Sequence, residues 1–341
     1  MGYVGSVLTQ YLRMQYPKSF LIGYDTCFFG HSLLGNSYLP EKGLSVQHFG
    51  DIRDIQSSIL KGVDAIVHLA AVSNDPMGNE FEEVTTEINR HASVRLAKLA
   101  IQEKVKNFIF ASSCSMYGES DGRAKKESDS TNPLTAYARS KIGTEEDIRN
   151  IDLEDMTFTS LRFATACGWS DRLRLDLVLN DFVACAISSG EISVLSDGTP
   201  WRPLIDVEDM CRAINWGITR EKNNGGQFLA INTGNNLINY QVKQIALAVC
   251  KLIPETKITI NKDAPPDKRS YSVDFSMYEK LAIDFQPKIL LDQSISRINN
   301  ALRKINFSDK NFRQSSSIRL VTLRRHIDSK RLGRDLRWKS Y

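Results

Sequence analysis

Asn-Phe-Ile-Phe-Ala-Ser-Ser-Cys-Ser-Met-Tyr-Gly, residues 107–118, is the stretch that decides the fold. It begins as a short apolar run, typical of a buried strand, and ends in small polar residues. Two similar apolar runs precede it, at residues 20–24 and 65–69. Between the second and third runs, residues 94–101 carry apolar side chains at helical spacing. Buried strands that alternate with helices predict a parallel sheet with helices on both faces.

A pair of glycines at the start of the chain, in Gly2-Tyr3-Val4-Gly5, has the spacing of part of a glycine-rich turn. Such a turn lets the backbone approach the pyrophosphate of a dinucleotide, and the helix that follows points its free N–H groups at the phosphates. Asp25 ends an apolar run about twenty residues later, where an acid accepts hydrogen bonds from the adenosine ribose. Because an acid there repels a ribose phosphate, the predicted cofactor is NAD and not NADP.

The catalytic signal is the pair Tyr137 and Lys141. Their four-residue spacing places both side chains on one face of a helix. A nearby ammonium group favours the phenolate and lowers the tyrosine pKa toward the working pH. Ser113 follows the apolar run of residues 107–111, and its hydroxyl can share a substrate oxygen with Tyr137. We therefore predict a catalytic group of Ser113, Tyr137 and Lys141.

Composition narrows the class of protein. The 341 residues are 42% hydrophobic and 25% charged with a net charge of +4, which does not predict nucleic-acid binding. Six scattered cysteines without a Cys-x-x-Cys pair predict reduced thiols in the cytoplasm and no metal site. No apolar run reaches the roughly 18 residues of a membrane span.

Domain organisation follows from a change of pattern. Beyond about residue 159 the strands at 158–161, 192–195 and 227–231 are separated irregularly. The expected architecture is α/β: a Rossmann-type doubly wound sheet in residues 1–165 and a smaller, mainly substrate-binding α/β portion in residues 166–341. Some segments of the second portion are expected to return to the sheet. The basic stretch from Arg319 to Tyr341 is interpreted as a solvated terminal helix, with a polyanion-binding tail as the alternative.

Several motifs resemble those of a known family. They are Gly2–Gly5, Asp51-Ile-Arg53, His68-Leu-Ala-Ala71, Ser112–Gly118 and Tyr137-x-x-x-Lys141. Together they resemble the extended short-chain dehydrogenase/reductases, and more narrowly the NAD-dependent nucleotide-sugar epimerase/dehydratase group. The resemblance runs from Gly2 to about Leu291, and the tail Asp335–Trp338 is similar to that of some members.

The resemblance implies further site residues. Asp51 and Ile52 would lie beside the adenine, and Leu69, Ala70 and Ala71 under the pyrophosphate and ribose. Phe163 and Ala164 would border the nicotinamide, and Ser112 would also contact the cofactor. The substrate-binding residues would be Ser113, Cys114, Ser115, Asn180, Arg202 and Arg269, the two arginines suiting a diphosphate because a guanidinium binds phosphate oxygens bidentately. A surface ion pair is the alternative for Arg202 and for Arg269.

Two departures from the family pattern bear on the reaction. The 4,6-dehydratases of the family carry Asp and Glu after the catalytic Ser/Thr, whereas this chain has Cys114 and Ser115. Neither is a suitable acid–base pair for removing water near neutral pH, which argues against a dehydratase. Ser73 stands where the galactose epimerase has a cofactor-contacting lysine.

Three functions stay open at this point. The favoured one is an NAD-dependent epimerase that oxidises a nucleotide-activated sugar transiently and returns the hydride. The second is a one-way reductase or dehydrogenase of a nucleotide sugar, and the third is a non-catalytic binding protein on the same fold.

Two structural expectations complete the sequence analysis. Because Met1 directly precedes Gly2, the first strand of the sheet is expected to be truncated. The first glycine of the turn is expected to be missing as well. Family members commonly form homodimers through a four-helix bundle. The corresponding helices would be residues 89–104 and 135–150, with Ala92, Leu96 and Leu99 in the seam.

Overall fold

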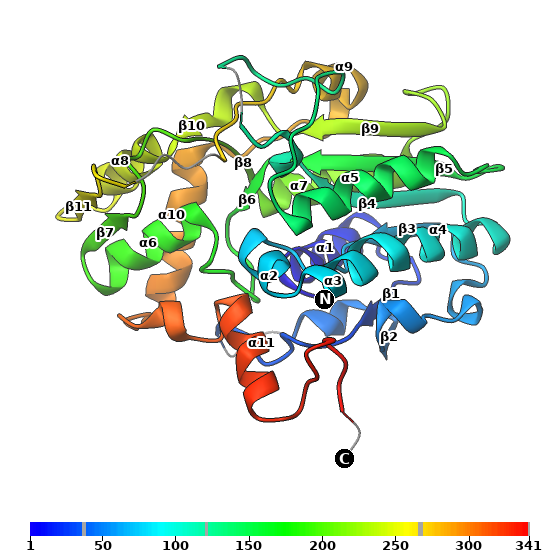
Figure 1. Ribbon diagram of the computed structural model, residues 1–341, viewed down its shortest axis with the longest axis horizontal. Helices are drawn as coiled ribbons and strands as arrows, with labels where there is room; N and C mark the ends of the chain where they lie inside the picture. Colours follow the sequence, from blue (N-terminus) through cyan, green and yellow to red (C-terminus); the bar gives the residue numbers. More distant parts are fainter. Residues whose placement is uncertain (36–38, 120–121, 265–268, 340–341) are drawn as a thin grey trace.

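The centre of the protein is a parallel sheet of four strands in the order β3-β4-β5-β9, seen in a computed structural model that describes residues 1–35, 39–119, 122–264 and 269–339 (Figure 1). The strands are β3 (Ala65–His68), β4 (Asn107–Ser113), β5 (Thr157–Phe163) and β9 (Phe228–Thr233). The predicted parallel sheet is thus confirmed. β9 comes from the second half of the chain, as expected for a segment that returns to the sheet.

Helices cover both faces of this sheet because β4 is apolar on both sides. Phe108 and Phe110 pack on one face with α4, whereas Ile109 packs on the other face with α7. On the first face lie α2 (Asp75–Glu80), α3 (Glu82–Thr86), α4 (Ala92–Gln102) and α5 (Ala136–Arg149); on the second lie α1 (Tyr3–Gln15) and α7 (Val207–Thr219). Two flanking helix layers around buried parallel strands make the sheet doubly wound.

The sheet is interrupted on the β3 side. β1 (Ile22–Asp25) pairs in parallel with β2 (Val46–Phe49), but among the described residues no strand joins β1 to β3. The interruption falls where the first strand of the sheet would lie, which is the strand expected to be truncated. β1 begins at Ile22, two residues later than the predicted run of residues 20–24. Phe20 lies outside the strand and is 71% exposed. We call the space between β1 and β3 the strand gap.

The second portion has its own apolar core, formed mainly by three helices beside the main sheet (Figure 1). These are α6 (Val178–Ser188), α8 (Val242–Leu252) and α10 (Leu291–Lys304). They pack with short strands: β6 (Thr165–Cys167), β8 (Trp201–Asp206) and β10 (Asn239–Gln241) in one sheet, and β7 (Glu191–Val194) with β11 (Lys257–Ile260) in another. The short helix α9 (Ser276–Leu281) lies near β9. The boundary at residues 165 and 166 stays a prediction.

Residues 319–339 of the C-terminal stretch are packed, which corrects the interpretation as a solvated helix; residues 340 and 341 lie outside the described residues. In α11 (Arg319–Asp328), Arg319, Leu323 and His326 are buried. The following tail lies against the segment after β2, where the Arg53 guanidinium donates to the carbonyl oxygens of Asp335 and Leu336 at 2.9 and 3.1 Å. The tail is therefore part of the wall of the first domain.

Two findings concern the described residues as a whole. No helix among them is long and apolar enough to cross a membrane. All six cysteines are free thiols, and no group of three or more potential metal-ligating side chains is found in the described ranges.

Candidate active site

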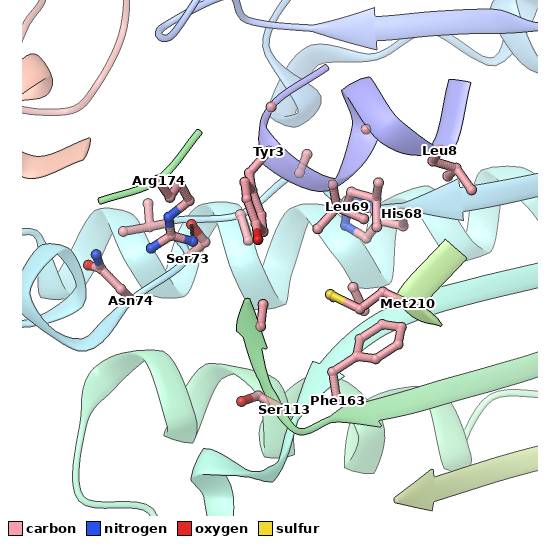
Figure 2. A pocket seen from close by; sticks show the side chains of 18 of the residues that line it. Tyr3, Leu8, His68, Leu69, Ser73, Asn74, Ser113, Phe163, Arg174 and Met210 are labelled. Atoms are coloured by element: carbon pink, nitrogen blue, oxygen red, sulfur yellow. Dashed lines mark hydrogen bonds between the residues drawn. The ribbon is translucent and has the colours of Figure 1, made fainter. Parts of the chain in front are cut away.

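One cavity of about 1310 Å³ opens between the two portions of the protein and continues into the strand gap. Figure 2 shows part of it, with Ser113 at the end of β4, Phe163 at the end of β5 and Arg174 at the far end beside Ser73. Residues at the carboxyl ends of parallel strands meet at one edge of a sheet, which is where α/β folds bind ligands. The cavity lining contains the predicted site residues apart from Cys114 and Asn180.

The predicted catalytic group comes together in this cavity. Ser113 ends β4, and Tyr137 and Lys141 lie on the first turns of α5, whose N-cap Thr135 accepts a hydrogen bond from the Ala138 amide at 3.2 Å. Burial raises the pKa of Tyr137 to about 12, although a hydrogen bond with Ser113 favours the phenolate. The protein alone therefore keeps Tyr137 protonated near neutral pH.

Lys141 is held against the backbone of β4. Its ammonium donates to the Ala111 carbonyl oxygen at 2.7 Å and lies 4.6 Å from the Phe110 ring centroid and 5.6 Å from that of Tyr137. Burial lowers the pKa of Lys141 to about 7, while the Glu145 carboxylate acts in the opposite direction. Near neutral pH the ammonium is thus close to losing its proton.

Two further charged residues face the catalytic group, and the sequence analysis missed both. The Arg174 guanidinium lowers the pKa of Tyr137, and the Asp75 carboxylate raises it. Arg174 pairs with Asp176 at 2.9 Å and donates to the Ser73 hydroxyl at 3.3 Å. The one sequence signal for Asp75 was its place in Ser-Asn-Asp-Pro, a typical helix start, because Asn74 caps α2.

The predicted cofactor residues line the cavity. Gly2, Tyr3, Val4 and Gly5 form the start of α1. Asp25 ends β1, where its carboxylate pairs with the Met1 ammonium and accepts from the Cys27 amide at 2.5 Å.

The residues predicted to lie beside the adenine are next to Arg53, which bonds the C-terminal tail. Ile52 is buried there, and Asp51 accepts from the Arg53 guanidinium at 2.6 Å. The lining also contains a second set of predicted cofactor residues: Leu69, Ala70, Ala71, Ser112, Phe163 and Ala164. The Ser112 hydroxyl, however, donates to Glu145 at 2.7 Å.

The predicted substrate residues divide into two groups. Ser113, Ser115, Arg202 and Arg269 line the cavity. Arg269 pairs with Asp75 at 3.2 Å, and the Arg202 guanidinium donates to the Trp201 carbonyl oxygen at 2.8 Å. Both arginines line the cavity, and their role in binding a substrate stays a prediction.

Cys114 and Asn180 do not face the cavity, which corrects their assignment as substrate residues. The Cys114 thiol is fully buried and donates to the Arg162 carbonyl oxygen at 3.0 Å, and burial raises its pKa. Asn180 is also fully buried, accepting from the Gly168 amide at 3.1 Å and donating to the Arg174 carbonyl oxygen at 3.0 Å. The Cys114 side chain thus bonds the backbone of β5, and the Asn180 side chain bonds the backbone of residues 168 and 174.

The fold and the cavity define a dinucleotide-binding α/β enzyme of the short-chain dehydrogenase type. Comparison with protein families matches residues 1–234 to the NAD dependent epimerase/dehydratase family. The chain belongs to this family, whose cofactor is NAD, and it is an enzyme of the nucleotide-sugar epimerase/dehydratase class.

Curated relatives agree with this placement, and solved structures share the fold. The chain is 28% identical over 223 residues to the uncharacterized UDP-glucose epimerase YtcB of Bacillus subtilis, covering 62% of this chain and 68% of the relative. It is 25% identical over 262 residues to UDP-glucose 4-epimerase of Corynebacterium glutamicum, covering 72% and 75%. MoeE5 in complex with UDP-glucuronic acid and NAD has the same fold, with a TM-score of 0.75 at 21% identity over 89% of this chain and 96% of that one. A further structural neighbour, TunA, is an NDP-hexosamine 5,6-dehydratase, with a TM-score of 0.74 at 17% identity over 89% and 95%.

Proposed function

We propose that this protein is an NAD-dependent epimerase of a nucleotide-activated sugar, with Ser113, Tyr137 and Lys141 as its catalytic group. The observation that carries the proposal is the shared cavity, which these three residues line together with the glycine turn, Asp25, Arg202 and Arg269. The curated relatives named above are described as UDP-glucose epimerases, which supports a nucleotide sugar as the substrate.

The residues present fit NAD. The start of α1 supplies free N–H groups for a pyrophosphate, and Asp25 supplies a carboxylate for ribose hydroxyls. Lys141 lies within the cavity on the Tyr137 side, where an ammonium can donate to the second ribose. When bound, NAD accepts a hydride from a sugar carbon and gives it back.

The chain's own residues handle the proton. Tyr137 as phenolate takes the proton of a sugar hydroxyl, and Ser113 holds the same oxygen, which becomes a carbonyl oxygen. Turning of the keto-sugar in the cavity exposes its other face, and Tyr137 then returns the proton as the hydride comes back. Arg174, which lowers the pKa of Tyr137, favours the phenolate needed for the first step.

The positions after Ser113 favour epimerisation over elimination. Elimination of water needs an acid and a base beside the sugar. Cys114 is buried away from the cavity, and Ser115 presents a hydroxyl, which is neither a strong acid nor a strong base. Asp75 is the nearby carboxylate, and it is engaged by Arg269 and Thr135. The TunA similarity makes elimination the second candidate.

The test is to incubate the protein with NAD and a panel of nucleotide sugars and to follow products by NMR and the cofactor by absorbance at 340 nm. Epimerisation yields a stereoisomer of the substrate with no net formation of NADH. Net NADH formation would instead support a dehydrogenase, net consumption of added NADH a reductase, and loss of water a dehydratase. Absence of NAD binding and of any turnover would support a non-catalytic protein.

A further inference from the structure

Three buried arginines, Arg172, Arg174 and Arg319, interact with one another near the start of the chain. Arg172 pairs with Glu41 at 2.7 Å, and Arg174 pairs with Asp176 at 2.9 Å. Arg319, from α11, is 2% exposed, and no ion pair of its guanidinium is found within the described ranges. Its Nη2 donates to the Arg172 carbonyl oxygen at 2.7 Å, but its Nη1 is buried with no hydrogen-bond partner.

An unsatisfied buried cation is costly for the folded protein. Moving a charge out of water without a partner is strongly unfavourable, and two guanidinium neighbours add repulsion. The pKa of Arg319 is lowered to about 9, first by burial and then by Arg174. A contact with the Phe29 ring, 4.5 Å from the guanidinium carbon to the ring centroid, offsets only part of this cost.

The position of Arg319 in the cavity indicates which kind of ligand could accept a hydrogen bond from its Nη1. Arg319 lines the same cavity as Gly2 and Gly5. It is joined to the start of the chain through Arg172, whose carbonyl oxygen accepts from Arg319 and whose guanidinium donates to the Met1 carbonyl oxygen.

The start of α1 is a second, independent feature at this place. No side chain caps this 13-residue helix, and its first turn carries no acidic residue. The N–H groups of the first turn and the positive end of the helix dipole therefore favour an anion. The Arg172 guanidinium donates to the Met1 carbonyl oxygen at 2.9 Å, so the residue that accepts from Arg319 also holds the start of the chain.

We propose that Arg319 binds a diphosphate diester at the N-terminus of α1, so that the C-terminal helix completes the phosphate site formed by the first turn of the chain. The inference rests on the proposed function, because that function makes NAD the source of the diester. The diphosphate of a nucleotide sugar is the other source of the same group. A diester with two negative charges matches an unpaired guanidinium beside a helix N-terminus.

The test compares Arg319→Met with Arg324→Met, a matched control on the exposed side of α11 whose guanidinium pairs with Glu80. Calorimetric titrations of full-length protein use NAD, ADP, UDP, inorganic pyrophosphate and adenosine, which lacks phosphate. Loss of a charge-assisted hydrogen bond should weaken NAD, ADP and pyrophosphate binding about 10- to 100-fold in Arg319→Met and leave adenosine and UDP unchanged. Arg319→Lys should recover part of the loss, and Arg324→Met should bind like the wild type.

Stability of the ligand-free protein separates a binding role from a structural one. Among the described residues no carboxylate lies within ion-pair distance of Arg319, and the more distant Asp176 and Asp25 offset only part of the effect of burial. Arg319→Met should therefore melt no lower than the wild type. A lower melting temperature with weakened binding of adenosine would overturn the proposal, and so would weakened UDP binding with unchanged NAD binding. A wild type that binds pyrophosphate through Arg319 but not NAD would keep the anion site and refute the proposed function.

Discussion

Adding a strand to the strand gap would test whether the edges of β1 and β3 can pair with a strand between them. β1 and β3 each offer one edge without a strand partner among the described residues, and all eight of their residues line the cavity. We predict that a fusion of about ten residues ahead of Gly2, containing a six-residue apolar strand and a glycine three residues before Gly2, will insert between them in parallel.

The expected gain follows from three contributions. Burying three or four large apolar side chains contributes about 5–10 kcal/mol. About eight backbone hydrogen bonds to the four-residue strands β1 and β3 contribute about 8 kcal/mol. Ordering six residues costs about 9 kcal/mol. The net stabilisation is therefore about 4–9 kcal/mol, which in a protein of this size raises the melting temperature by roughly 10 °C or more.

The assay is differential scanning calorimetry of the fusion with and without NAD. The control is an extension of equal length made of Gly and Ser, which cannot form an apolar strand. The apolar fusion should melt higher than the control and bind NAD more tightly, because the added glycine lengthens the phosphate-binding turn. Equal melting temperatures and equal NAD affinities for the two fusions would refute the reasoning, and would mean that β1 and β3 do not accept a strand.

Four further predictions concern the site and the assembly. Tyr137→Phe should lower turnover roughly 10²–10⁴-fold while NAD binding, measured by titration, is kept; undiminished turnover would disprove its role as the base. Asp25 should make NAD bind more tightly than NADP, and equal or tighter NADP binding in parallel titrations would show that the ribose acid is misassigned. Since the pKa of Lys141 falls to about 7 on folding, the unfolded chain binds more protons above pH 7; stability should therefore rise from pH 7 to 9, and Lys141→Met should abolish that rise in calorimetric melts. Light scattering at micromolar concentration should give a dimer mass, and a monomer would exclude the helix-bundle dimer.

The dimer seam shows one limit of sequence reasoning. Ala92 and Leu96 are buried in the core beside the sheet and therefore cannot also form an exposed seam. Leu99 is only partly buried and stays available. Helical spacing identifies an apolar face, but it does not say whether that face meets the sheet or a second subunit.

The strands could be predicted because their signal is local. The apolar runs at residues 65–69 and 107–111 became β3 and β4 with only small shifts at their ends. The catalytic group could also be predicted, because a four-residue spacing on one helix and a strand end fix its geometry. Both inferences use neighbours in sequence, which backbone periodicity controls.

The wrong and missing assignments of site residues have a common physical cause: the orientation of each side chain depends on partners far away in the sequence. Asn180 turns inward to satisfy Gly168 and Arg174, and Cys114 turns toward Arg162, 48 residues away. Arg319 comes from a basic helix that looks solvated in the sequence. Its burial follows from packing against residues about 150 and 300 positions earlier, such as Arg172 and Phe29.

The ionisation of the catalytic group links chemistry to cofactor binding. In the protein alone Tyr137, with a pKa of about 12, holds its proton, while Lys141, with a pKa of about 7, is close to losing one. Proton abstraction by Tyr137 needs the opposite: a deprotonated Tyr137 and a protonated Lys141. Burial is the first cause of both shifts, and a bound group that adds positive charge beside Tyr137 or hydrogen-bond acceptors beside Lys141 acts against them. A nicotinamide ring and its ribose supply these two features, and Tyr137 is therefore expected to become a competent base only in the protein with NAD bound.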